Sequence, residues 1–259
     1  MHAPRLLAAT LVCSAALVGL TACGPTDAKK STDAAAPSAS AAPSKAPALG
    51  DLTAAEIIKK GQEASAKATS VKLTFDLTSE GLHLTGTVAQ DATGNCVGQV
   101  TYGDKGAFEL LRTGGKIWLK PDAKFWQVIA PEAAKAGAGK YLAGDANGPR
   151  LKDLATFCDL GLESLKKVGK NDDGTDDTAG AVKGAPKQVG SLKAVVVTDA
   201  ADGEKSEVAF AAEGEPYLLQ LSISGKEPST MTFSDFQQPV AVTAPAAAQV
   251  IDAAKYLKG

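Results

Sequence analysis

The chain has 259 residues, of which 44% are hydrophobic, 22% are charged and 5% are aromatic, and its formal net charge is −2. A charge balance this close to zero argues against a nucleic-acid partner, because nucleic-acid-binding domains need a basic face. Only two histidines and four cysteines are present, which leaves few residues that could build a metal site.

The N-terminus has the pattern of an export signal that ends in a lipid-attachment site. Arg5 precedes an apolar run from Leu6 to Leu20, and small residues lead to Cys23. This position is typical of bacterial lipoproteins, so we predict that residues 1–22 are removed and that Cys23 carries the lipid at the extracytoplasmic face of the membrane. The alternatives are a signal peptide cut elsewhere and a spanning helix, although a span needs about 20 apolar residues.

A tether is expected between this anchor and the folded part of the chain. After Cys23, residues 24–50 are mostly Ala, Pro, Ser, Lys and Thr. Such a stretch buries too little apolar surface to offset the entropy lost on ordering, so we predict that residues 23–50 are disordered. A flexible coil of this length would hold the domain roughly 30 Å from the membrane. The folded domain is then predicted to span residues 51–259.

The first part of this domain is predicted to be one helix followed by a meander of antiparallel strands. Thr53 and Glu56 have the spacing of a capping box, and the helix is expected to continue to about Ala68. Apolar and polar residues then alternate with a period of two, which is typical of half-buried strands. Strands are expected over residues 71–77, 82–88, 96–102, 108–112 and 116–120, with glycine in the turns between them.

The rest of the domain is predicted to return to helix and then to strand. Helical spacing of apolar residues covers residues 121–138 and 149–167. Four strands and a short terminal helix are expected to follow, over residues 192–199, 207–211, 217–223, 230–236 and 245–257. The order of helix, strands, helices and strands favours a single α+β domain in which helices lie on one side of one antiparallel sheet.

Two cysteines remain once Cys13 leaves with the signal and Cys23 takes the lipid. Cys96 and Cys158 would then face an oxidising compartment, where disulfides persist, so we predict that they are bonded. In the chain-entropy model, closing a loop of about 60 residues stabilises a fold by about 4 kcal/mol. The alternatives are two buried free thiols and a pair of metal ligands.

Neither catalysis nor a cofactor is predicted. The mature chain has one histidine, His83, in the middle of an alternating strand on its polar face. A catalytic histidine needs a hydroxyl or thiol within reach and an orienting carboxylate, and no Gly-x-Ser-x-Gly motif is present. The acidic segment 171–177 lacks the ligand spacing of a calcium loop and is better explained as a hairpin tip. We therefore expect no catalytic residue, no cofactor and no metal.

Several of these features together resemble a known family. The lipid-attachment cysteine, the tether, the pair Phe125-Trp126, the run Thr232–Phe236 and the later Pro239 and Pro245 occur in this order. In that order they resemble actinobacterial lipoproteins of the LppX/LprG type, which are related in fold to the LolA/LolB carriers. The resemblance implies a curved antiparallel sheet, a half-barrel, with helices covering its concave face and an apolar cavity between them. It also implies binding of acylated lipids or glycolipids.

The resemblance directs attention to large apolar residues on the strands and in the middle of the chain. The residues expected to line the cavity are Val71, Leu73, Phe75, Leu77, Leu82, Leu84, Trp118, Phe125 and Trp126. The alternative is that they simply fill the core. The predicted function is that of a monomeric, membrane-anchored carrier of a hydrophobic ligand. The alternative function is an envelope interaction or sensor module without lipid cargo.

Overall fold

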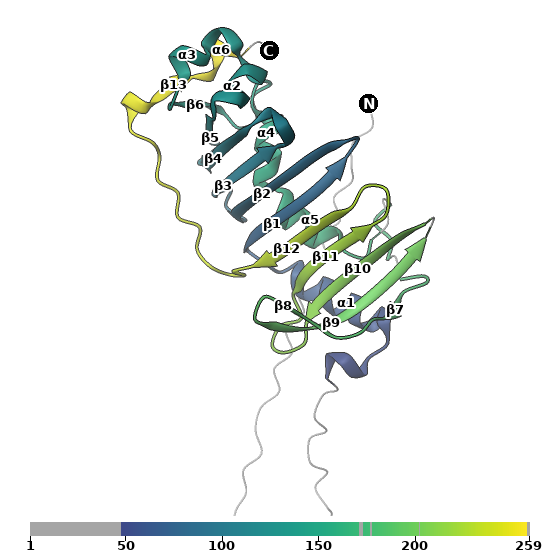
Figure 1. The fold of residues 1–259 in the computed structure, drawn as a ribbon. Helices are drawn as coiled ribbons and strands as arrows, with labels where there is room; N and C mark the ends of the chain where they lie inside the picture. The colour runs from purple at the N-terminus through teal and green to yellow at the C-terminus, as the bar shows by residue number, and fades with distance from the viewer. Residues whose placement is uncertain (1–47, 171–172, 177, 202, 258–259) are drawn as a thin grey trace, which may run out of the picture. The chain divides into compact units, whose positions relative to one another are not determined.

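The computed structural model describes residues 48–170, 173–176, 178–201 and 203–257, so the predicted lipid attachment at Cys23 lies outside the described residues. The described chain forms one open, curled sheet of 13 strands (Figure 1). The strands of its first half are β1 (Ser70–Ser79), β2 (Leu82–Asp91), β3 (Cys96–Tyr102), β4 (Ala107–Thr113), β5 (Lys116–Pro121) and β6 (Tyr141–Asp145). The later strands are β7 (Val182–Lys183), β8 (Lys187–Val189), β9 (Leu192–Ala201), β10 (Glu204–Ala211), β11 (Leu218–Ser224), β12 (Ser229–Ser234) and β13 (Val250–Asp252).

Two meanders make up most of the sheet. Strands β1 to β6 are neighbours in chain order, and so are β9 to β12. The antiparallel pair β1–β12 joins the two meanders, with Leu73 opposite Phe233. The predicted antiparallel order holds except at one edge, where β13 pairs with β6 in parallel and Ile251 lies opposite Leu142.

The helices pack against one face of the sheet, which we call the inner face. They are α1 (Ala54–Ser65), α2 (Ala123–Ile129), α3 (Ala134–Gly137), α4 (Lys152–Ala155), α5 (Leu160–Lys167) and α6 (Ala253–Tyr256). Helix α1 contacts β9 and β11, α5 contacts β1 and β2, and α2 contacts β4 and β5. One apolar cluster contains residues of these helices, such as Ile57 and Leu165, together with Leu73 and Phe210 of the strands. The mixed α+β class is therefore confirmed.

Alternation along the strands decides which side chains reach that cluster. Val71, Leu73 and Phe75 are at most 2% exposed, whereas the intervening Thr74 and Asp76 point to the other, outer face. A second, smaller apolar cluster lies on the outer face of β9 and β10. Its members are Val189, Ala194, Val196, Ala209, Ala211 and Leu219, and it is covered in part by the segment that carries β8.

The predicted capping box is confirmed at the start of α1. The Thr53 amide donates to the Glu56 carboxylate over 2.9 Å, and the Glu56 amide donates to Thr53 Oγ1 over 3.3 Å. The chain is ordered slightly before this point, because Leu49, which falls in the predicted tether, is 9% exposed and belongs to the main cluster.

The long helices predicted for the middle of the chain are wrong. Residues 121–138 form α2, one 3₁₀ turn and α3, because Pro131 cannot continue α2 and the backbone at Ala138 is no longer helical. Residues 149–167 are divided in the same way between α4, a 3₁₀ turn and α5. Strand β6 lies between these segments and was not predicted. The predicted terminal helix over 245–257 is mostly β13 and α6.

Candidate functional site

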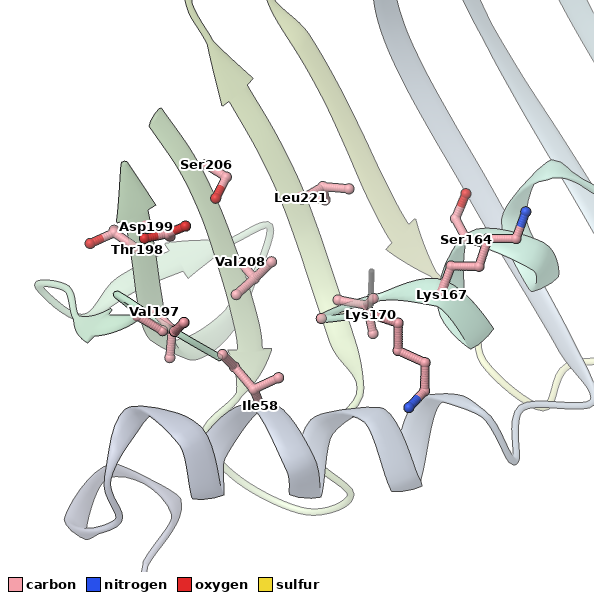
Figure 2. Close-up of a pocket in the computed structure, with 14 residues that line it drawn as sticks. Ile58, Ser164, Lys167, Lys170, Val197, Thr198, Asp199, Ser206, Val208 and Leu221 are labelled. Atoms are coloured by element: carbon pink, nitrogen blue, oxygen red, sulfur yellow. The ribbon is translucent and has the colours of Figure 1, made fainter. Parts of the chain in front are cut away.

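A cavity of about 280 Å³ lies between α1, the end of α5 and the inner face of β9, β10 and β11 (Figure 2). Its apolar wall consists of Ile58, Val168, Ala181, Val197, Val208 and Leu221. Its polar wall consists of Ser164, Lys167, Lys170, Thr198, Asp199 and Ser206. The cavity therefore offers both kinds of surface that an amphiphile needs, an apolar wall and a polar wall.

The cavity results from short side chains on this part of the inner face. Ser206 and Val208 of β10 occupy inner positions there, whereas Phe75 and Phe108 occupy inner positions in the first meander. Helix α1 also cannot move closer to close the gap. Its Gly61 already meets the Phe210 ring, so that a Cβ at this position would lie 2.1 Å from Phe210 Cε1. The shorter side chains therefore leave space unfilled.

Helix α5 is anchored firmly at its N-terminal end, away from the cavity. The predicted disulfide Cys96–Cys158 is confirmed, with Cα atoms 5.5 Å apart, and it ties the 3₁₀ turn before α5 to β3. Arg112 of β4 adds two charge-assisted hydrogen bonds to the carboxylate of Asp159, over 2.8 and 2.5 Å. This end of the helix is thus fixed covalently and by an ion pair.

The C-terminal end of α5, which borders the cavity, is hydrogen-bonded to a side chain of α1. Gln62 of α1 is 9% exposed, and its Nε2 donates to the carbonyls of Val168 and Gly169, both over 2.8 Å. These carbonyls follow the last helical turn and would otherwise have no partner within the helix. Gln62 therefore connects the two helices that border the cavity.

The polar wall contains two lysines with different surroundings. Lys170 donates to the carboxylate of Asp176 over 2.7 Å, and this hydrogen bond, followed by the charge of Lys170, lowers the pKa of Asp176. Lys167 is exposed and forms no ion pair with any residue that the structure describes. Its ammonium is therefore available to a ligand.

The nine residues that were predicted to line a cavity lie outside the cavity beside α1. Leu77, Leu82 and Leu84 are half-buried on the inner face of β1 and β2, beside the buried Val71, Leu73 and Phe75. Phe125 and Trp126 are buried in α2.

Trp118 points to the outer face, where the Lys116 ammonium lies 5.4 Å from its ring. None of the nine borders the cavity beside α1, so their role in ligand binding remains a prediction. The residues that do border it, such as Val197 and Val208, fell within predicted strands but had no feature that distinguished them from core.

No arrangement for covalent chemistry is apparent in the described ranges. His83 lies on the outer face with Nε2 2.7 Å from the Asp76 carboxylate, and both side chains are exposed. The part of the chain that the structure describes contains no group of three or more metal-ligating residues and no helix long and apolar enough to span a membrane. Part of the acidic segment 171–177 lies outside the described residues.

Comparisons with known proteins find similarity in fold and not in sequence. No family model and no curated protein sequence matches the chain. The solved structure of LprF from Mycobacterium bovis matches with a TM-score of 0.50 and 17% identity, over 75% of this chain and 97% of that one. The lipoprotein LppX of Mycobacterium tuberculosis matches with a TM-score of 0.47 and 17% identity, over 73% and 98%. The resemblance to lipoproteins of the LppX/LprG type is thus confirmed in fold. A sequence identity of 17% says nothing of whether the function is shared.

Proposed function

We propose that this protein is a lipid-anchored binding protein that holds a hydrophobic ligand in the cavity between α1, α5 and strands β9 to β11. The cavity itself carries the proposal, because it lies where the helices meet the inner face of the sheet and one of its walls is apolar. Its volume of about 280 Å³ is close to the lower end of the range of roughly 300–1,000 Å³ for small-molecule sites.

Burial of apolar surface would supply the binding energy. Each buried CH₂ group contributes about 0.8 kcal/mol, so about a dozen buried carbon atoms would supply roughly 9 kcal/mol. After the cost of immobilising the ligand is subtracted, the expected dissociation constant is submillimolar. Binding of this kind is reversible and needs no catalytic group. The proposed role is therefore that of a carrier or receptor of hydrophobic molecules at the extracytoplasmic face of the membrane.

Filling the cavity tests the proposal. Val208 is half-buried and borders the cavity, so Val208→Phe would place a ring in space that a ligand needs. We expect this variant to bind a fluorescent alkyl probe at least tenfold more weakly than the parent, with a melting temperature within about 3 °C of it.

The matched control is Val182→Phe, the same change at a strand position that is 59% exposed, which should leave binding unchanged. Equal probe affinity of the parent and Val208→Phe would show that the probe binds outside the cavity. Absence of binding by the parent at probe concentrations up to about 1 mM would rule out the carrier role and favour the interaction module.

The proposed anchor requires a separate test. Replacing Cys23 by Ala removes the thiol that forms the thioether, so the expressed protein should move from the detergent phase to the aqueous phase on phase separation. Cys13→Ala is the matched control, because Cys13 belongs to the predicted signal and its loss should leave partitioning unchanged. A Cys23→Ala protein that still entered the detergent phase would contradict lipid attachment at this residue.

A further inference from the structure

The cavity has an apolar wall and a polar wall, and together they restrict which kinds of ligand can bind. We infer that the ligand is an amphiphile with a single alkyl chain and an anionic head group, with the chain against Ile58, Val197 and Val208 and the head group at Lys167. This inference rests on the proposed function and adds the class of ligand to it.

The volume limits the ligand to one chain. An apolar cavity of about 150 Å³ holds one molecule of benzene, so a cavity of about 280 Å³ has room for about a dozen carbon atoms. Protein interiors are packed closely and do not expand at small cost, so a second chain would have to remain outside. A diacyl lipid would leave its second chain exposed to water and would gain nothing from it.

The donors on the polar wall favour an anion as the head group. Lys167, Ser164 and Ser206 can all donate hydrogen bonds, and the oxygens of a carboxylate, sulfate or phosphate only accept them. Ser164 and Lys167 lie three residues apart on α5, so their side chains point to the same side of the helix, as Figure 2 shows.

One carboxylate, that of Asp199, also borders the cavity, but from the opposite wall. It comes from β9, across the cavity from α5 (Figure 2), and it lies close to Gly180, where a Cβ would be 2.7 Å from Asp199 Oδ1. Its side chain is short and fixed by the strand, whereas the long stem of Lys167 can carry its ammonium to the end of an alkyl chain. The cation that is free to move should therefore select the charge of the head group.

A chain-length series tests the number of carbons. Sodium alkyl carboxylates of 6 to 16 carbons, below their micellar concentrations, would be titrated against the parent by calorimetry. We expect affinity to rise about fourfold for each added carbon and to level off at 10 to 12 carbons, when the cavity is full. A continued rise to 16 carbons, or tighter binding of a short-chain phosphatidic acid with two chains, would overturn the single-chain limit.

A second comparison tests the head group. Decanoate, decanol and decyltrimethylammonium share one chain length and differ in charge. We expect the parent to bind decanoate about tenfold more tightly than decanol, and decyltrimethylammonium most weakly. Lys167→Met keeps the stem and removes the charge, so it should abolish the preference for decanoate and leave the affinity for decanol unchanged.

Lys166→Met is the matched control, because Lys166 is exposed and does not border the cavity. Its Nζ lies 3.8 Å from Oε1 of Glu163. If decanol or the cationic probe bound as well as decanoate, the anionic head group would be wrong while the proposed function remained. If none of the three probes bound at concentrations up to about 1 mM, the proposed function itself would fail.

Discussion

Replacing Cys96 and Cys158 together by Ser should lower the free energy of unfolding by about 4 kcal/mol. The disulfide joins residues 62 positions apart, so its loss releases a long loop in the unfolded chain. Both cysteines are at most 1% exposed and belong to the main apolar cluster, so the new hydroxyls would also be buried. Urea denaturation followed by circular dichroism measures the change.

The parent with a strong reductant provides the control for this experiment. Reduction should reproduce most of the loss, because it opens the same loop without altering the side chains. The expectation would be wrong if the double variant lost less than about 1 kcal/mol. The remaining link between Arg112 and Asp159 would then be sufficient to hold the start of α5.

Gly61→Val is expected to cost about 3 kcal/mol and to abolish binding of a cavity probe. A Cβ at this position would lie 2.1 Å and 2.2 Å from two atoms of the Phe210 ring, so either the ring or the whole of α1 must move. Because Ile58 of the same helix borders the cavity, a shift of α1 would also distort the site.

Ala55→Val is the matched control, because Ala55 is exposed on the same helix. It should cost only the difference in helix propensity, which is about 0.5 kcal/mol. Chemical denaturation and probe titration of both variants provide the comparison. Equal stabilities of Gly61→Val and Ala55→Val would show that α1 does not depend on close approach to the sheet.

Local patterns in the sequence predicted the elements that depend on neighbouring residues. The alternation around Val71 and Leu84 predicted β1 and β2, and the capping box predicted the start of α1. Strand β6 escaped prediction, although it pairs with its neighbour β5, and it is only 5 residues long. Strand β13 escaped because it pairs through only a few residues with a distant partner, with Ile251 opposite Leu142. No local signal encodes such a pairing.

The cavity could not have been located from the sequence for a related reason. Alternation predicts which side chains face the helices, but not whether they fill the space beneath them. Phe75 and Leu73, which were predicted to line a cavity, are at most 2% exposed and do not border this one. The space lies where Ser206 and Val208 are too short to reach α1, and it depends on how closely that helix approaches through Gly61.

The pairing of β1 with β12 also affects the order in which the domain can fold. Each meander can form from hairpins that close short loops, which is entropically cheap and fast. The pair Leu73–Phe233 instead joins residues near the two ends of the described domain, so it closes the longest loop and should form last. Until then, the edge of β1 that faces away from β2 is unpaired and could be extended by another chain, and the pairing with β12 closes this route to aggregation.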